Sequence, residues 1–272
     1  MKRKTTLSII LIAVCFALYG QNEYSGIVFG KKSQLPVEYV NVGIAGKNIG
    51  TVTDANGKYS LLINSENAND SLLFSSIGYE SYAIRISELK KNGNVYIEEK
   101  TYTLNEVIIK PLLLKERTFG IPKGSKLTVT GFQNSSLGYE CGLLMNTKKK
   151  AYLKSVHLNV AVCSYDSVFF RLNIYQANNE MDYENILQEP IYVSASKEDV
   201  LKNGLSIDLD GKNITVEGEF LVALEHIKDL GEGKLFFSSS LKRKTYSRYT
   251  SQGEWKTLPI GMSLSVVADV EK

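Results

Sequence analysis

The chain has 272 residues, of which 43% are hydrophobic, so it is long enough to bury the cores of two domains. Its 32 basic and 29 acidic residues give a formal charge of +3, and Lys2, Arg3 and Lys4 account for that excess. A chain that is otherwise balanced has no long-range field to draw it to phosphates or to an anionic membrane. We therefore expect no nucleic-acid partner, and we interpret the basic runs Lys148–Lys150 and Lys242–Lys244 as solvated turns.

Residues 1–20 have the pattern of an export signal. A basic start is followed by the short apolar segment Leu7–Leu18 and by small or turn-prone residues near Gly20. The segment is shorter than the roughly 20 apolar residues that span a bilayer. We expect cleavage near Gly20–Gln21, no membrane span afterwards, and a product that is periplasmic, outer-membrane-associated or extracellular. The alternatives are a retained anchor or a lipoprotein linked through Cys15, although Val14 stands where lipoprotein signals have a small residue.

Residues 21–109 predict about seven short strands, because runs of alternating apolar and polar residues are separated by turn residues. The first run is Tyr24–Phe29. Between Thr51–Thr53 and Lys58–Ile63 lies Asp54-Ala55-Asn56-Gly57, whose aspartate can accept backbone N–H groups and whose glycine tolerates positive φ. We therefore expect a hairpin across Asp54–Gly57, within a small β-sandwich.

Several motifs occur in order along this region: Gly26-x-Val28, Pro36, Val40-x-Val42, Gly50-Thr51-x-Thr53-Asp54-x-x-Gly57-x-Tyr59 and Phe74-Ser75-x-Ile77-Gly78-Tyr79. Together they resemble the carboxypeptidase regulatory-like domain, and this resemblance implies a transthyretin-like, seven-stranded sandwich. Leu104–Ile109 also resembles the end of this domain in outer-membrane TonB-dependent receptors. About 160 residues follow here, too few for a barrel of some twenty strands at ~10 residues each, so we do not expect such a receptor.

The second half of the chain is again β by pattern. Residues 110–122, with Pro111 and Pro122, form the expected linker to residues 123–272. The elements predicted beyond it are strands at Lys126–Phe132, Ala151–Val162, Val168–Tyr175, Phe220–His226, Lys234–Ser238 and Met262–Ala268, and a short helix at Lys197–Lys202. The strand count predicts a second, larger β-sandwich of jelly-roll-like or galactose-binding-like type, so the expected fold class is all-β.

No motif for catalysis or metal binding stands out. The two histidines, His157 and His226, lie on separate predicted strands without metal-ligand spacing, and no Gly-x-Ser-x-Gly occurs. We expect no catalytic residue, metal or cofactor, and the lesser alternative is a hydrolase whose site escapes motif analysis. Cys141 and Cys163 could form a disulfide in an oxidising compartment, or could be two small buried residues on separate strands.

Aromatic residues supply the candidate binding site. Trp255, Tyr246 and Tyr249 lie beside turns and charged residues such as Arg248. Sugar-binding sandwiches stack apolar sugar faces on such rings, so these four residues are candidate ligand-binding residues, although most aromatics of a sandwich serve its core. Alternation places Tyr246 and Arg248 on one face of a strand and Tyr249 on the other. We expect a non-enzymatic binding protein of the bacterial envelope that recognises a glycan or a partner protein. The alternative is a structural assembly subunit that docks through sheet edges.

Overall fold

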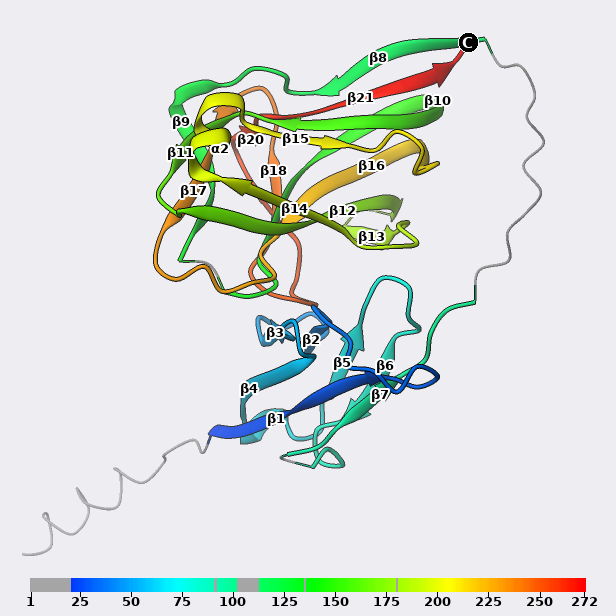
Figure 1. The fold of residues 1–272 in the computed structure, drawn as a ribbon, viewed down its shortest axis with the longest axis vertical. Coiled ribbons are helices and arrows are strands. Elements are labelled where there is room, and N and C mark those ends of the chain that lie inside the picture. Colours follow the sequence, from blue (N-terminus) through cyan, green and yellow to red (C-terminus); the bar gives the residue numbers. More distant parts are fainter. Residues whose placement is uncertain (1–20, 91, 102–112, 135, 180) are drawn as a thin grey trace, which may run out of the picture.

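The computed structural model describes residues 21–90, 92–101, 113–134, 136–179 and 181–272 (Figure 1). The expected export signal lies outside these residues, as does Leu104–Ile109. Strands dominate the described chain, which confirms the all-β prediction. Within the described ranges, no helix is long and apolar enough to cross a membrane.

The N-terminal domain is a sandwich of two sheets, with strand orders β4-β1-β7 and β3-β2-β5-β6. Its strands are β1 (Gln21–Gly30), β2 (Asn41–Ile44), β3 (Gly50–Val52), β4 (Lys58–Asn64), β5 (Ser71–Ser75), β6 (Tyr82–Arg85) and β7 (Val95–Ile97), with a 3-10 turn, η2 (Ser65–Asn67), after β4. Val28 and Ile63 of the first sheet meet Val42, Leu72 and Phe74 of the second in one buried core. The seven-stranded sandwich is therefore confirmed.

The turn at Asp54–Gly57 forms, but the hairpin predicted across it is wrong. Asp54 Oδ1 accepts the backbone N–H of Asn56 at 2.8 Å, and Gly57 has a φ of +71°. However, β3 pairs with β2, whereas β4 pairs with β1 in the other sheet. The ring of Tyr59 on β4 packs edge-on against Phe74 across the core, 5.4 Å between centroids, so β4 has to lie in the facing layer. The turn residues reverse the chain without deciding which strands pair.

The C-terminal domain packs a ten-stranded sheet against a four-stranded sheet. The large sheet runs β13-β12-β16-β10-β18-β19, with β14 on β12, β15 and β21 on β10, and β8 on β21; the small sheet runs β11-β17-β20, with β9 on β17. Its elements are β8 (Leu114–Gly120), β9 (Ser125–Gln133), β10 (Glu140–Leu158), β11 (Val160–Cys163), β12 (Ser167–Asn179), β13 (Asp182–Asn185), β14 (Ile191–Ser196), α2 (Lys197–Asn203), β15 (Leu205–Asp208), β16 (Thr215–Glu225), β17 (Lys234–Ser240), β18 (Thr245–Arg248), β19 (Lys256–Leu258), β20 (Gly261–Met262) and β21 (Leu264–Glu271). The core between the two sheets includes Leu143 and Phe170 from the large sheet and Phe132 and Phe237 from the small one.

The described part of the expected linker belongs to this second domain. Residues 114–120 form β8, which pairs along its whole length with β21 at the edge of the large sheet. The C-terminal domain therefore includes Leu114–Gly120, which lie within the residues expected to form the linker.

The two domains contact each other through the β2–β3 turn and the loop after β18 (Figure 1). The backbone N–H of Gly46 donates to Gln252 O at 2.9 Å, and Gln252 Nε2 donates to Ser75 Oγ at 2.7 Å. A Cβ placed on Gly43 would lie 2.4 Å from Ser251 O, a separation that real Cβ atoms do not show. The backbones of the two domains therefore meet at a position where only glycine fits.

Candidate functional site

Four charged residues stand opposite one another across four strands of the large sheet. Arg171 on β12 pairs with Glu225 on β16, Glu225 pairs with Glu140 on β10, and Glu140 pairs with Arg248 on β18. Residues directly opposite on neighbouring strands share one face of a sheet. The residues that alternate with them, such as Leu172, lie in the sandwich core, so this charged row is on the other face.

Arg171 connects the charged row to the N-terminal domain. Its Nε and Nη2 donate to Glu225 Oε2 at 2.9 and 2.7 Å, Nη1 donates to Tyr39 O at 2.7 Å, and Nη2 also donates to Asn41 Oδ1 at 2.6 Å. Asn173 Nδ2 donates to the same carboxylate oxygen at 2.7 Å. Burial by itself lowers the pKa of the Arg171 guanidinium, but the charge and hydrogen bonds of Glu225 outweigh it, and the pKa is raised.

The other half of the row is held by a tyrosine. Tyr175 donates its hydroxyl to Glu140 Oε2 at 2.8 Å, Arg248 Nε donates to Glu140 Oε1 at 3.1 Å, and Arg248 Nη2 bonds the same oxygen. Burial raises the pKa of Glu140, Arg248 opposes that change, and the neighbouring charge of Glu225 adds to it. Two carboxylates and two guanidiniums therefore form a charge-balanced cluster.

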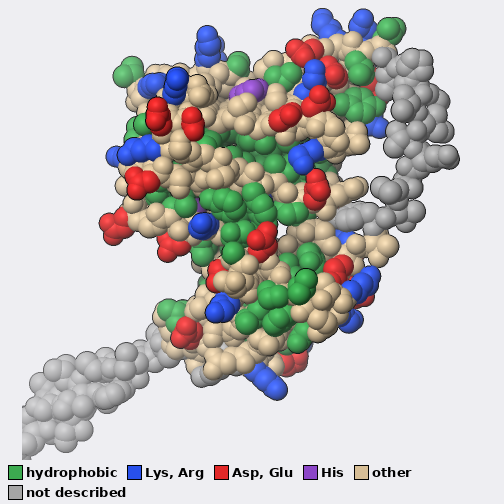
Figure 2. Space-filling model, viewed as in Figure 1, with side chains coloured by type: hydrophobic (Ala, Val, Ile, Leu, Met, Phe, Trp, Pro, Cys, Tyr) green, Lys and Arg blue, Asp and Glu red, His purple; other side chains and the backbone are tan. Residues whose placement is uncertain are grey.

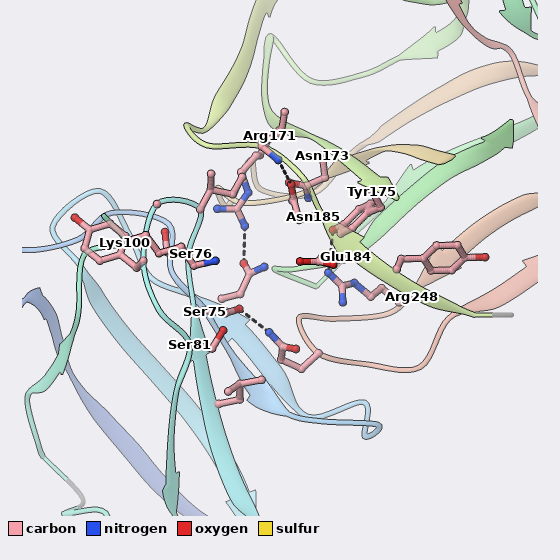
Figure 3. Close-up of a pocket in the computed structure, with 18 residues that line it drawn as sticks. Ser75, Ser76, Ser81, Lys100, Arg171, Asn173, Tyr175, Glu184, Asn185 and Arg248 are labelled. Carbon is pink, nitrogen blue, oxygen red and sulfur yellow. Dashed lines mark hydrogen bonds between the residues drawn. The ribbon is translucent and has the colours of Figure 1, made fainter. Parts of the chain in front are cut away.

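A cavity of about 360 Å³ opens between the domains beside this cluster (Figure 3). The C-terminal domain contributes Arg171, Asn173, Tyr175, Tyr183, Glu184, Asn185, Leu187, Arg248 and Gln252, and the N-terminal domain contributes Asn41, Leu73, Ser75, Ser76, Ile77, Gly78, Tyr79, Ser81 and Lys100. Figure 3 shows the labelled serines and Lys100 on one side of the cavity, facing the arginines and asparagines on the other. Clefts between domains, lined by a few convergent polar groups, are common binding sites.

An aromatic cluster borders the cavity on the same face of the sheet. Trp255 packs edge-on against Tyr175 and Tyr183, with ring centroids 5.8 and 5.5 Å away, and Tyr183 packs against Tyr246 at 6.1 Å. The Arg248 guanidinium lies 4.9 Å from the centre of the Trp255 ring, a cation–π contact. Because Tyr175, Tyr183 and Arg248 also line the cavity, polar cavity and aromatic cluster form one continuous surface.

The N-terminal residues that line this cavity lie in a segment that matches a known family. The family model of the CarboxypepD_reg-like domain matches residues 24–109. The N-terminal domain is a CarboxypepD_reg-like domain. No curated protein matches the chain. The matched segment contains every N-terminal residue that lines the cavity, so the CarboxypepD_reg-like domain forms one wall of the candidate site.

The structure brings three of the four candidate ligand-binding residues together. Trp255, Tyr246 and Arg248 lie in or beside the aromatic cluster, and Trp255 is partly buried outside the sandwich core. Tyr249 is 56% exposed and contacts Tyr139, 5.9 Å between ring centroids. It lies away from the cluster, as expected from the alternation along the strand.

The sequence prediction missed the polar half of the site. Arg171 and Asn173 alternate with the apolar residues of β12, and such an interruption of an apolar strand is a readable signal. Glu140 and Glu225 each stand at the end of a strand and give no such signal. Only the register of β10 and β16 shows that they are neighbours.

Cys141 and Cys163 are two small buried residues on separate strands, which is the alternative to a disulfide. Both thiols are free and buried, on β10 of the large sheet and β11 of the small one. Cys163 Sγ donates to Tyr165 O at 3.5 Å, and burial raises the pKa of the Cys141 thiol. No disulfide joins them in the described part of the chain, and both side chains are buried in the core between the two sheets.

The ring of His157 lies between two serine hydroxyls. Ser155 Oγ lies 2.9 Å from its Nε2, and Ser206 Oγ lies 3.0 Å from its Nδ1. Both ring nitrogens thus face hydroxyls, whereas a catalytic triad requires a carboxylate to orient the ring. Among the described residues there is also no group of three or more His, Cys, Asp or Glu side chains that could hold a metal ion.

Proposed function

We propose that the protein is an exported, non-enzymatic binding protein of the bacterial envelope, and that it recognises a glycan at the cavity between its two domains. One observation carries the proposal: a cavity with polar walls from both domains is continuous with the cluster of Trp255, Tyr183 and Tyr246. Export rests on the signal pattern of residues 1–20.

The chemistry of the two surfaces suits a sugar chain. Hydroxyl groups of a glycan can both donate and accept, and the cavity presents serine hydroxyls at Ser75, Ser76 and Ser81 and an amide at Asn185. The apolar faces of sugar rings stack on aromatic side chains, which the partly buried Trp255 provides beside the cavity. A polar cavity bordered on one side by aromatic residues therefore suits a glycan better than an apolar ligand.

The buried carboxylates support binding rather than hydrolysis. Glu140 and Glu225 are both 0% exposed, and each is already bound by a guanidinium. A glycosidase needs its two carboxyl groups on either side of the sugar bond. A carboxylate that touches no cavity cannot reach such a bond.

Affinity electrophoresis in polysaccharide gels, with glycans chosen by array screening, tests the proposal. Trp255→Ala and Tyr183→Ala should each weaken retention about 2- to 10-fold, the range for loss of one aromatic contact. Tyr249→Ala is the matched control, because this exposed tyrosine lies away from the cluster, and it should bind like the native protein. The bound glycan should be recovered uncleaved. Full retention by correctly folded Trp255→Ala and Tyr183→Ala variants would contradict the proposal.

A groove on the CarboxypepD_reg-like domain favours a second candidate, a subunit that docks a partner protein. β6 and β7 each pair with a single described strand, and the groove between them has a volume of about 710 Å³. Tyr82 and Tyr96 line it and are 40% and 46% exposed. Open strand edges accept an additional strand from a partner.

A photo-crosslinking residue at position 82 distinguishes the two functions. A docking subunit should give a discrete crosslinked product in envelope extract, and that product should disappear in a Tyr96→Ser background. A glycan-binding protein should show retention in the gel that is unaffected by the same substitution. Absence of any crosslinked product would remove the docking candidate.

A further inference from the structure

One end of the C-terminal domain gathers segments that are distant in the sequence. Ser239 on β17 pairs with Ser125 on β9, and Ser240 pairs with Gly261 on β20. A Cβ on Gly261 would lie 2.9 Å from the Cβ of Arg243, so the β17–β18 turn packs against β20. We call this end the basic tip, and define it by its exposed residues: Lys123, Lys126, Leu127, Leu241, Lys242, Arg243 and Lys244.

The charges of the basic tip all have one sign. Segments 121–130 and 239–245 contain its five lysine and arginine residues and no aspartate or glutamate. None of these five forms an ion pair with an acidic residue of the described ranges. Arg243 Nη1 donates to Leu144 O at 3.3 Å, and this neutral carbonyl does not offset the charge of the guanidinium. The overall charge balance of the chain thus conceals a local excess of positive charge.

Two leucines project from the same tip. Leu127 is 97% exposed and Leu241 is 75% exposed. Leu127 lies in a bulge of β9 where its backbone N–H donates to Ser125 Oγ at 3.1 Å, and Leu241 lies in a turn where the N–H of Lys242 donates to Ser240 Oγ at 3.3 Å. One exposed leucine needs no explanation, but two on short, hydrogen-bonded turns among lysines form an amphipathic surface.

The neighbouring helix extends this surface on one side. Asn159 Nδ2 donates to Pro122 O at 2.6 Å, and the C-cap of α2, Gly204, approaches Leu158 O, so the end of α2 lies beside the tip. That end carries Lys202 and the 44% exposed Leu201. The acidic residues of α2 are in its first turn, away from the tip. In Figure 2, basic and hydrophobic side chains project from the end of the molecule where Figure 1 places β9 and α2, with acidic side chains beside them at α2.

We infer that the basic tip docks the protein on an anionic lipid surface. Lysine and arginine side chains pair with anionic headgroups, and exposed leucines enter the boundary between headgroups and acyl chains. The basic residues and the leucines are both needed. Insertion of two leucines is weak by itself, and the total charge of the chain is too nearly balanced to attract it to an anionic membrane. The docking is therefore oriented, reversible and sensitive to salt.

Vesicle flotation with the chain that begins at Gln21 tests this inference. That chain contains every described residue and omits Leu7–Leu18, an apolar segment that would bind vesicles by itself. Vesicles of phosphatidylcholine alone are compared with vesicles that also contain phosphatidylglycerol, at low and high salt. We expect binding only to the anionic vesicles at low salt.

Two pairs of variants and two matched controls locate the contact. Lys242→Glu with Lys244→Glu, and Leu127→Ser with Leu241→Ser, should each lower the partition coefficient at least about tenfold, since one basic residue near the surface contributes about fivefold. Lys148→Glu with Lys149→Glu makes the same change of charge at another exposed run and should leave binding within about threefold of the native protein. Leu62→Ser, which replaces a 58% exposed leucine of the N-terminal domain, should also leave vesicle binding within about threefold of the native protein.

Four results would overturn the inference. They are no binding to anionic vesicles at low salt, equal binding to phosphatidylcholine, equal loss in the control variants, and binding to single-stranded DNA without binding to vesicles. The last result would assign the basic tip to another polyanion. Circular dichroism confirms that each variant is folded before flotation.

Discussion

Replacing Arg171 by methionine should destabilise the protein and uncouple its domains. The side chain is 2% exposed, and Glu225, its partner, is 0% exposed. Methionine retains an apolar stem but leaves a buried carboxylate with Asn173 as its remaining side-chain donor. Breaking a buried ion pair in this way costs about 3–5 kcal/mol. The contacts of Arg171 with Tyr39 O and Asn41 are lost as well, so the N-terminal domain should unfold in a transition of its own.

Urea unfolding, followed by two signals, measures both effects. Trp255 is the only tryptophan and reports on the C-terminal domain, whereas far-UV circular dichroism reports on both domains. Lys212→Met is the control, because its ion pair with Glu189 is exposed and should contribute less than about 1 kcal/mol.

The double variant Arg171→Met with Glu225→Gln removes both charges and should recover at least half of the loss, since no charge is then left unpaired in the interior. A loss below about 1 kcal/mol in the single variant would refute the reasoning. So would a double variant whose loss equals the sum of the two single losses, because that result would mean that the pair is not coupled.

Three further changes have direct readouts. Hydrogen bonds from the backbone of Ser33 lower the pKa of Glu99 from 4.5 to about 2, so its stabilisation is complete above the unfolded-state pKa and is lost as the pH falls towards 2. The difference in urea midpoint between native protein and Glu99→Gln should therefore shrink between pH 5 and pH 2, and a constant difference would contradict this origin. Gly43→Ala sets a Cβ 2.4 Å from Ser251 O and should cost about 1–3 kcal/mol, which an unchanged unfolding midpoint would disprove. Because burial raises the pKa of Cys141, its thiol should react with a disulfide reagent only after unfolding, and rapid labelling of the native protein would count against this environment.

The N-terminal fold follows from the sequence because turns and alternation are local signals. Turn residues mark where the strands end, and alternation marks which face is buried, as at Tyr59 and Ile63 of β4. The pairing of β3 and β4 could not be obtained in this way. A turn at Asp54–Gly57 is compatible with a hairpin and with a crossing between sheets, and the choice depends on packing across the core.

For the candidate site too, local sequence patterns predict some residues, whereas others become neighbours only in the folded structure. Trp255 and Arg248 were identifiable because they stand beside turns, and their meeting depends on a loop that folds back over a strand. Glu140 and Glu225 are 85 residues apart in the sequence, and they are neighbours only because of the register between β10 and β16. The wall supplied by the N-terminal domain depends on how two domains dock, for which no local pattern exists.

The charged row also limits where the large sheet can change length. A side chain on a strand moves to the opposite face when pairing shifts by one residue. A one-residue deletion within the paired part of β16 would turn Glu225 toward Leu172 and its apolar neighbours, with no guanidinium beside it. Such a buried charge without a partner is strongly unfavourable. A shifted register in the large sheet is therefore destabilised, and we expect additions or losses of residues to be tolerated in the turns between strands rather than within the strands.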